Sequence, residues 1–303
     1  MNILVTGGTG FVGNRLLHSL LKRMIPGREE RIFTTGVASE NELPDRVELL
    51  PNTDLSKLPK YLPRIDVLYH IAANNDTLCK DKEDMFQANV YEPIVLFQKV
   101  LELGCQRFVY ASSTAVYGNQ QAPYNEHTPT QPLNVYAESK LAFDHFAMNF
   151  AVKHKVRVNG LRYCNVYGPG ELHKGRRMSM IGQMLRQALH GDELHLFKWG
   201  EQRRDWVYVD DVVSANILAS VSYKSEIYPI GSGASWTFNQ IVDEIKKRLP
   251  STAVSFVDCP FVESYQNYTE CDIRKASVEL KYNPVYDLSK GIQAYLDYLT
   301  SFS

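Results

Sequence analysis

The sequence predicts an α/β protein whose core is a doubly wound parallel sheet. Short apolar runs suited to buried strands alternate with amphipathic helical segments five times in the N-terminal part of the chain, which is typical of a parallel sheet with helices on both faces. A glycine-rich turn joins the first run to the first helix, and small or polar residues follow later runs. Ligands bind beyond the carboxyl ends of such strands, so we expect a site near Gly7, Ala72 and Ser113.

The composition describes an ordinary globular protein of one large domain or two closely packed ones. Of 303 residues, 44% are hydrophobic and 22% are charged, and the net charge of -1 gives no electrostatic basis for binding nucleic acid. No apolar run approaches membrane-spanning length and no leader segment precedes the first strand, so we expect a cytoplasmic homo-oligomer that binds no membrane. The five cysteines show no C-x-x-C pairing and no His at ligand spacing, so we expect reduced thiols and no metal.

The first candidate site is the turn after the apolar run from Ile3 to Val5. Gly7, Gly10 and Gly13 lie three residues apart, which allows a sharp turn, leaves room for a phosphate against bare backbone, and lets the helix pack closely on the strand. Glycines also cluster in ordinary turns, but the helix that follows directs its N-terminal N–H groups and positive dipole end at this turn. We therefore expect a dinucleotide pyrophosphate to bind Gly7, Gly10, Phe11, Val12 and Gly13.

The end of the second strand, expected over Arg31–Thr35, bears on the choice of cofactor. An acidic residue at this point usually binds the adenosine ribose hydroxyls and selects NAD. Thr35 ends the strand and no acid follows before Glu40, which favours NADP slightly over NAD. The nearest basic residue that could pair with a ribose phosphate is Arg15, near the glycine turn.

Further cofactor contacts are expected beyond the third and fourth strands. Asp54 suits either an adenine or the cap of the next short helix. Asn89 lies in a largely buried helix expected over Lys82–Leu103, where a polar side chain indicates a hydrogen bond to a neighbouring loop. The candidate contacts from these segments are Asp54, Leu55, Ala72, Ala73 and Asn89.

The residues suited to proton transfer follow the fifth strand, expected over Arg107–Ser112. Tyr136 and Lys140 lie four apart in a helix expected over Asn134–Lys153, so they share one face. An ammonium beside a phenol lowers the phenol pKa from about 10 toward neutrality, which would let Tyr136 accept a proton. Ser113 can orient a substrate hydroxyl at Tyr136. A lone Tyr and Lys at this spacing is usually structural, and the glycine turn and the serine favour catalysis here.

The C-terminal half is less regular and predicts a second lobe. The sixth strand is expected over Val156–Tyr163. Four later helices are expected around Met180–His190, Asp211–Ser222, Thr237–Leu249 and Leu288–Leu299, with short strands near His195, Val207, Tyr228 and Val254. We assign residues 1–167 and about 205–231 to a cofactor-binding domain, and about 168–204 and 232–303 to a substrate-binding lobe.

Four motifs resemble one group of enzymes. They are Thr6–Gly13, Ala111–Gly118, Tyr136-x-x-x-Lys140 and Arg204–Val209. Together they are similar to the extended short-chain dehydrogenases/reductases that modify nucleotide sugars, over essentially the whole chain. The resemblance implies a Rossmann domain that binds NAD(P) and a C-terminal lobe that binds a nucleoside-diphosphate sugar. It gives Tyr136 the role of general acid/base, Lys140 those of ribose anchor and pKa modifier, and Ser113 that of hydrogen-bond partner.

Two further segments resemble the ADP-glycero-manno-heptose 6-epimerases: Pro132–Tyr136, and Arg162–Pro169 followed by His173–Gly175. This resemblance implies that Lys174 is a second acid/base, whereas its basic loop would equally suit a solvated surface or a bound diphosphate. Asn165 suits either a substrate contact or a loop cap. The chain departs from the family pattern at Gly170, where Arg is more usual. The expected substrate contacts are Ser113, Asn165, His173, Lys174, Phe197, Arg204 and Tyr265.

A pair of acid/base groups suits an epimerase. Hydride removal from a carbinol gives a ketone with two reducible faces, and rotation of the ketone would present its oxygen to Tyr136 in one orientation and to Lys174 in the other. We therefore expect NAD(P)-dependent inversion at C6 of an ADP-glycero-manno-heptose. The alternatives are another nucleotide-sugar 4-epimerase or 4-keto reductase and, in a different class, a non-catalytic NADP-binding sensor. Thr114 and Ala115 replace the acidic pair of a 4,6-dehydratase, which argues against dehydration.

Overall fold

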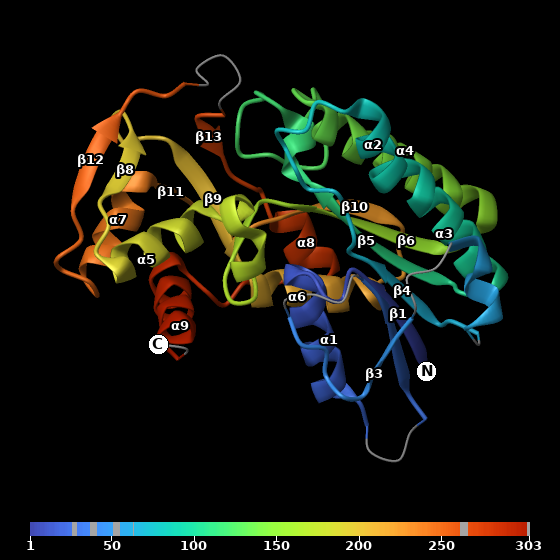
Figure 1. Cartoon of the computed structure of the whole chain (residues 1–303). Coiled ribbons are helices and arrows are strands. Elements are labelled where there is room, and N and C mark those ends of the chain that lie inside the picture. The colour runs from blue at the N-terminus through green and yellow to red at the C-terminus, as the bar shows by residue number, and fades with distance from the viewer. Residues whose placement is uncertain (26–28, 37–40, 51–54, 63, 261–265, 302–303) are drawn as a thin grey trace.

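The chain forms two lobes that lie side by side. The computed structural model describes residues 1–25, 29–36, 41–50, 55–62, 64–260 and 266–301. The larger lobe contains the N-terminus and a central sheet, while the smaller one contains the C-terminal helix α9 (Leu288–Thr300) (Figure 1).

Seven parallel strands form the central sheet in the order β10-β6-β5-β4-β1-β2-β3. The chain winds outward from β1 through β2 to β3, then returns to β4 on the other side of β1 and winds outward through β5 and β6 to β10. The direction therefore reverses between β1 and β4, and this switch point opens a crevice beyond the strand ends. The predicted fold class is confirmed. The strands are β1 (Asn2–Thr6), β2 (Arg31–Thr35), β3 (Val47–Leu49), β4 (Val67–His70), β5 (Arg107–Ser113), β6 (Arg157–Tyr163) and β10 (Glu226–Ile230).

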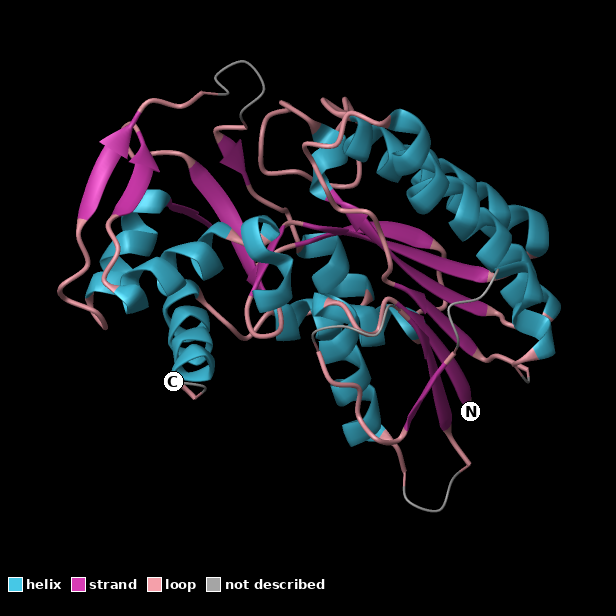
Figure 2. Cartoon of the chain, viewed as in Figure 1, coloured by secondary structure: helices cyan, strands magenta, loops and turns pink. Residues whose placement is uncertain are grey.

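Helices cover both faces of this sheet, because successive side chains of each strand point to opposite faces. Ile3 and Val5 pack with α1 (Phe11–Arg23) and α6 (Val209–Ser220), together with α8 (Arg274–Glu279). Leu4 packs with residues of α4 (Val135–His154) and of the helical segment that precedes β5. Figure 2 shows a helical layer on each side of the sheet. The apolar runs are thus buried on both faces.

The helix predicted over Lys82–Leu103 forms in three parts. They are α2 (Lys82–Phe86), a π-helical turn η2 (Gln87–Tyr91) and α3 (Glu92–Glu102). The π turn places Asn89 in the interior, where its amide accepts from Asn74 N (2.8 Å) and donates to Asn74 O (2.9 Å) and to Ser139 Oγ of α4 (3.0 Å). The expected hydrogen bond to a neighbouring loop is therefore present.

The smaller lobe has two sheets of its own and contains all three tryptophans of the chain, Trp199, Trp206 and Trp236. Its core joins both sheets to the helices, with Trp206 packed edge-on against Phe238 at 5.9 Å between ring centroids. The strands are β7 (Asn165–Tyr167), β9 (Arg203–Tyr208), β11 (Ser235–Thr237) and β13 (Tyr268–Thr269) in one sheet, and β8 (Leu194–Phe197) and β12 (Val254–Val257) in the other. The helices are η4 (Leu172–Arg177), α5 (Met180–His190), α7 (Phe238–Lys246) and α9.

The segment of about 205–231 divides between the two lobes. Its last strand, β10, joins the central sheet beside β6, as expected. The strand near Val207, which the sequence places in the cofactor-binding domain, is β9 and pairs instead with β7, β11 and β13. The boundary between the two domains remains a prediction.

A buried carboxylate joins the strands where the lobes meet. Asp205 of β9 is fully buried and accepts hydrogen bonds from Ser232 N and Oγ (2.7 Å each), Gly233 N (3.2 Å) and Cys271 N (3.1 Å). These bonds tie β9 to the turn after β10 and to the segment after β13. Cys164, Asp205 and Cys271 cluster closely enough to hold a metal ion, but these four donors already occupy the Asp205 carboxylate.

Among the helices that the structure describes, none combines the length and apolar character that crossing a membrane requires.

Candidate functional site

The glycine turn has the form that a pyrophosphate needs. Gly7 adopts φ +70° and lies so close to Ala72 that a Cβ would come within 2.9 Å of the Ala72 Cα. A Cβ on Gly13 would lie 2.1 Å from the Gly7 carbonyl oxygen, so α1 can approach β1 only with glycine there. Gly10 caps α1 with no side-chain hydrogen bond, and no acid lies in the first turn. The N–H groups of Phe11 and Val12 therefore open an uncapped, positively polarised helix end.

The neighbouring strand ends complete a cradle that fits a dinucleotide. The N–H groups of Gly7 and Gly8 donate to Thr35 O at 2.9 and 3.1 Å, and Ala72 N donates to Thr6 Oγ1 at 3.2 Å. These bonds hold the ends of β1, β2 and β4 together around the turn. Ala73, which follows, is exposed. Asp54 lies outside the described residues, and Leu55 begins the short helix η1 (Leu55–Lys60).

Arg15, the suggested partner of a ribose phosphate, already has a partner. Its guanidinium donates to both carboxylate oxygens of Asp210 on α6 at 2.7 to 2.9 Å. A bidentate pair of this kind fixes the guanidinium in one place. Arg15 therefore joins α1 to α6, which weakens the basis for an NADP preference.

The proton-transfer candidates come together at the ends of β5 and α4. The Lys140 ammonium lies 5.9 Å from the centroid of the Tyr136 ring and donates to Ala111 O at 3.0 Å. The Ser113 side chain is hydrogen bonded to Tyr136. Asn134 caps the helix by accepting from Ala137 N at 2.8 Å, which fixes the first turn that carries Tyr136. The three residues thus share one small region at the crevice.

The protonation states in this region differ from the expectation. Burial raises the pKa of Tyr136, and the hydrogen bond from Ser113 lowers it only in part. The expected fall in the Tyr136 pKa through Lys140 is therefore wrong for the protein alone. Burial also lowers the pKa of Lys140 to about 8, against the charge of Asp144, which raises it. Because its pKa is about 8, Lys140 loses the positive charge that should stabilise a phenolate only slightly above neutral pH.

Lys174 lies at the glycine turn, on a loop held by buried contacts. Its ammonium is 5.1 Å from the centroid of the Phe11 ring and 3.8 Å from Glu171 Oε2. Glu171 is fully buried and accepts from Ser179 N and Oγ at 2.6 Å. Burial lowers the pKa of Lys174, while Glu171 raises it. The position above the start of α1 suits either a substrate proton or an anionic oxygen.

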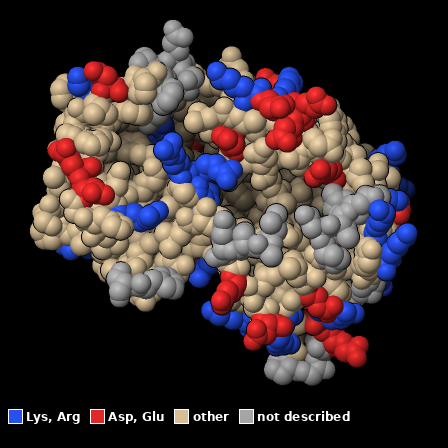
Figure 3. Space-filling model, viewed as in Figure 1, with Lys and Arg blue, Asp and Glu red and all other residues tan. Residues whose placement is uncertain are grey.

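The loop around Lys174 is also bonded to the glycine turn. Asn41 Nδ2 donates to Thr9 O (3.2 Å) and Gly170 O (3.1 Å), and lies 3.3 Å from His173 Nδ1. Figure 3 shows Lys and Arg side chains gathered beside a hollow between the two lobes. The basic residues that η4 contributes are Lys174, Arg176 and Arg177.

The other expected substrate residues that the structure describes occupy the smaller lobe. Arg204 is buried, and its guanidinium donates to Arg203 O at 2.9 Å. Asn165 Nδ2 donates to Asp205 O (3.0 Å) and Thr269 Oγ1 (3.1 Å), which favours its role as a loop cap. Phe197 ends β8, and Tyr265 lies outside the described residues.

Four residues that sequence reasoning missed support the site. Asn41 and Glu171 hold the Lys174 loop, and no local pattern marks them. Asp144 lies four residues after Lys140, so its helical spacing could have identified it as a neighbour of the ammonium. Arg162, its partner, comes from β6 and depends on the tertiary fold.

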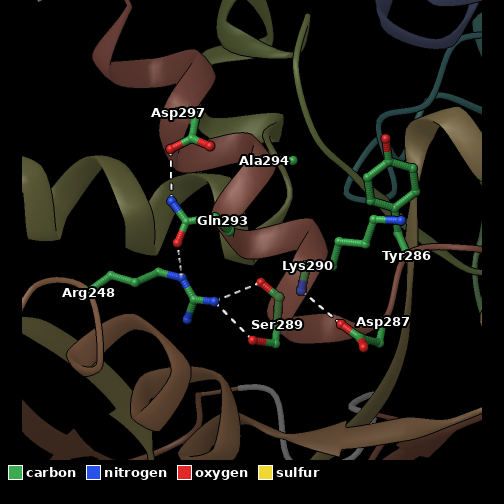
Figure 4. Close-up of a pocket in the computed structure, with 8 residues that line it drawn as sticks. All are labelled: Arg248, Tyr286, Asp287, Ser289, Lys290, Gln293, Ala294 and Asp297. Atoms are coloured by element: carbon green, nitrogen blue, oxygen red, sulfur yellow. Dashed lines mark hydrogen bonds between the residues drawn. The ribbon is translucent and has the colours of Figure 1, made fainter.

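A shallow hollow in the smaller lobe is separate from this site (Figure 4). It lies along α9, and its polar side chains bind one another. Arg248 Nε donates to Gln293 Oε1 (2.8 Å), and its NH2 group donates to Ser289 O and Oγ (2.9 Å each). Internal hydrogen bonds therefore hold this face together.

Known proteins share both the sequence and the fold. The NAD dependent epimerase/dehydratase family model matches residues 3–231. The ADP-L-glycero-D-manno-heptose-6-epimerase of Alkalilimnicola ehrlichii is 34% identical, over 97% of this chain and 96% of its own. The enzyme of that name from Brachyspira hyodysenteriae is 31% identical, over 98% of this chain and 97% of its own.

Solved structures agree with this. The ADP-L-glycero-D-manno-heptose-6-epimerase of Helicobacter pylori has a TM-score of 0.87 at 31% identity, with 99% of this chain and 96% of that chain covered. The UDP-glucose 4-epimerase of Thermotoga maritima, solved with UDP-glucose, has a TM-score of 0.91 at 25% identity, with 100% and 99% covered. The chain therefore belongs to the NAD dependent epimerase/dehydratase family and, as its sequence predicts, is an NAD(P)-dependent epimerase.

Proposed function

We propose that this protein inverts C6 of an ADP-glycero-manno-heptose by transient oxidation and reduction. The observation that supports the proposal is that the chain has two separate groups suited to proton transfer near the ends of the parallel strands. Tyr136, Lys140 and Ser113 lie at the end of β5, and Lys174 lies above the first turn of α1. The full-length similarity to two enzymes that carry the heptose-epimerase name supports the same substrate.

Each of the proposed catalytic residues has a separate role in this reaction. A bound NAD(P)⁺, which the glycine turn from Gly7 to Gly13 would hold, would supply the hydride chemistry that interconverts a secondary alcohol and its ketone. Tyr136 takes the proton of that alcohol and gives a proton back during reduction. Burial raises the Tyr136 pKa in the protein alone, and we propose that the Lys140 ammonium, 5.9 Å from the ring centroid, stabilises the phenolate once cofactor and substrate are bound. Ser113 holds the reacting oxygen beside the phenol. When the ketone has rotated, Lys174 donates the proton to its oxygen in place of Tyr136.

The substrate diphosphate needs cationic partners, which the smaller lobe supplies. Arg204 presents a guanidinium suited to a pair of anionic oxygens, and Lys174 of η4 is a second cation that could bind one. We propose Arg204, His173, Phe197 and Tyr265 as substrate contacts. We also propose a small preference for NADP over NAD, because no acid ends β2, although the Arg15–Asp210 pair keeps that preference small.

The proposal is tested by incubating the purified protein with ADP-glycero-manno-heptose and following the C6 epimers by NMR. We expect interconversion without added reductant, because the cofactor is recycled. Tyr136→Phe and Lys174→Ala should each lower the rate by roughly 10²-fold or more, since each removes a proton-transfer group. Arg176→Ala, an exposed change in the same loop, should lower it far less.

Two other results would redirect the assignment. Full activity in Lys174→Ala together with loss in Tyr136→Phe would favour a 4-epimerase or 4-keto reductase, as the structure from Thermotoga maritima also suggests. Substrate-dependent absorbance of reduced nicotinamide would exclude the third alternative, a non-catalytic cofactor sensor, because a sensor oxidises no substrate.

A further inference from the structure

A chain of buried polar side chains lies directly beneath the proposed catalytic residues. Asp144 lies one helical turn after Lys140 in α4 and is fully buried. Its carboxylate accepts from Tyr110 Oη of β5 and from Arg162 Nε of β6, each at 2.9 Å. A buried carboxylate and guanidinium are costly to remove from water, so the pair is stable only while both partners remain. The reaction proposed above assigns no role to either residue.

Arg162 extends this chain to the turn that follows Ser113. Its NH1 group donates to Tyr117 Oη at 3.0 Å, and its guanidinium lies 4.9 Å from the centroid of that ring. Tyr117 ends the short helix η3 (Thr114–Tyr117), for which Ser113 is the cap. The guanidinium therefore connects the helix that carries Tyr136 to the turn that carries Ser113.

Asp144 is also the anion nearest in sequence to Lys140 on the inner face of α4. The groups that face Lys140 are Tyr136 on its own helix and His70 from β4, and burial lowers the pKa of His70 to about 3, so it carries no charge at neutral pH. Tyr110 and Arg162 face Asp144. Asp144 alone raises the pKa of Lys140, which burial lowers to about 8.

We propose that Asp144 and Arg162 are positioning residues that lock α4 to the turn after Ser113. The Asp144 carboxylate also supplies the negative charge one helical turn from the buried Lys140 ammonium. The proposal rests on the proposed function for the roles of Tyr136 and Lys140. It does not depend on which sugar is the substrate or on the role of Lys174.

The direct test replaces the carboxylate by its neutral isostere, Asp144→Asn. Loss of the charge lowers the pKa of Lys140 below about 8, so the ammonium is lost at a lower pH. The alkaline limb of the kcat profile should move down by about one pH unit or more, with ~10-fold less activity at about pH 9, roughly threefold less at about pH 7.5, and little loss below about pH 6. Asp144→Glu, which keeps the charge, should restore the limb.

Matched variants separate the charge from the packing. Tyr110→Phe removes a hydrogen bond to Asp144 but no charge, so it should leave the alkaline limb in place. Asp144→Asn leaves Arg162 buried without an anion and can unfold the protein. The double variant Asp144→Asn with Arg162→Met removes both charges, so it should fold while keeping the shifted limb.

The titration of Lys140 can be measured without substrate. This test of the positioning residues therefore does not depend on the proposed function. Lysine labelled with ¹³C at Cε reports the titration of Lys140 directly, and Lys140→Arg identifies its signal. A lower midpoint in Asp144→Asn and in the double variant supports the proposal even if no heptose is epimerised. An unmoved Lys140 titration in either folded variant overturns it.

Discussion

Burial controls the protonation of single side chains around the crevice. His70 ends β4 and is buried, with Nδ1 2.8 Å from Thr6 Oγ1 and rings of Phe97 and Phe143 against its edge. Desolvation, assisted by Lys140, lowers the pKa of His70 from 6.5 to about 3. The imidazole is therefore neutral in the folded protein across the physiological range and serves as a hydrogen-bonded part of the core.

This neutral imidazole predicts a loss of stability in acid. Between pH 6.5 and about 3 the unfolded chain binds a proton at His70 and the folded one does not, so the stability present above 6.5 falls as the pH falls. The contribution is ~1.4 kcal/mol per pH unit. Urea unfolding of the wild type and of His70→Gln should show a shallower decline with acid in the variant. Equal slopes would contradict a neutral buried His70.

At the scale of elements, the glycine turn combines two separate requirements. Gly13 is needed for the fold, because any Cβ there would meet the Gly7 carbonyl oxygen at 2.1 Å. Gly10 has an ordinary helix-cap conformation with φ -81°, and a Cβ there would come no nearer than 3.3 Å to that oxygen. The backbone therefore requires glycine at position 10 less than at position 13, which agrees with the proposed role of Gly10 in cofactor binding.

These two glycines should respond differently to alanine. Gly13→Ala should lower stability by about 1–3 kcal/mol, as overpacking does, and so lower the Tm. Gly10→Ala should keep the Tm near that of the wild type but weaken cofactor binding, because the methyl group occupies phosphate space. Calorimetric titration with NAD and with NADP measures this weakening, and the ratio of the two Kd values tests the cofactor preference. A Gly10→Ala protein that binds both cofactors normally would place the pyrophosphate elsewhere.

Most elements of the first lobe could be predicted because their signals are local. Most strands there contain a short apolar run, and the helices from Phe11 and Val135 show apolar spacing or a polar cap. The π turn at Gln87–Tyr91 has no comparable signal, because it depends on what Asn89 must reach in space. The placement of β9 in the second sheet likewise depends on pairing between distant strands, which one sequence does not reveal.

The candidate site could likewise be predicted only where its signals are local in sequence. Tyr136 and Lys140 could be paired from their spacing in one helix, and the structure places them at 5.9 Å. The direction of the Tyr136 pKa could not be predicted, because it is set by how deeply neighbouring segments bury the phenol. Arg162 and Glu171 read as ordinary charged residues in sequence, and only the fold brings them beneath the site.

At the scale of the whole molecule, the two lobes are joined by short polar links. Tyr124 N donates to Glu270 O (2.7 Å) and Asp272 N donates to Tyr124 O (2.8 Å), which connects the loop after η3 to the segment after β13. Asp205 binds four donors in the same region. The lobes are therefore held in a fixed relation around the crevice, and the joint should contribute strongly to stability.

Asp205→Asn tests that contribution. An amide cannot accept from all of the buried donors, so we expect a loss of about 1–3 kcal/mol in the free energy of unfolding, measured in urea. The control is Asp258→Asn, an exposed ion-pair partner of Lys198, which should change stability by less than about 0.5 kcal/mol. An Asp205→Asn protein as stable as the wild type would show that the joint depends on apolar packing instead.

The tryptophans lie only in the smaller lobe, so the two lobes can be followed by different fluorescence signals. All three indoles follow residue 198, and they range from Trp206, at 4% exposure, to Trp199, at 65%. Intrinsic indole emission therefore reports on the smaller lobe, whereas the fluorescence of a reduced dinucleotide, bound as proposed at the glycine turn, would report on the larger one. Quenching of one by the other measures their approach in a single cuvette, so denaturation that starts in either lobe can be followed without any engineered dye.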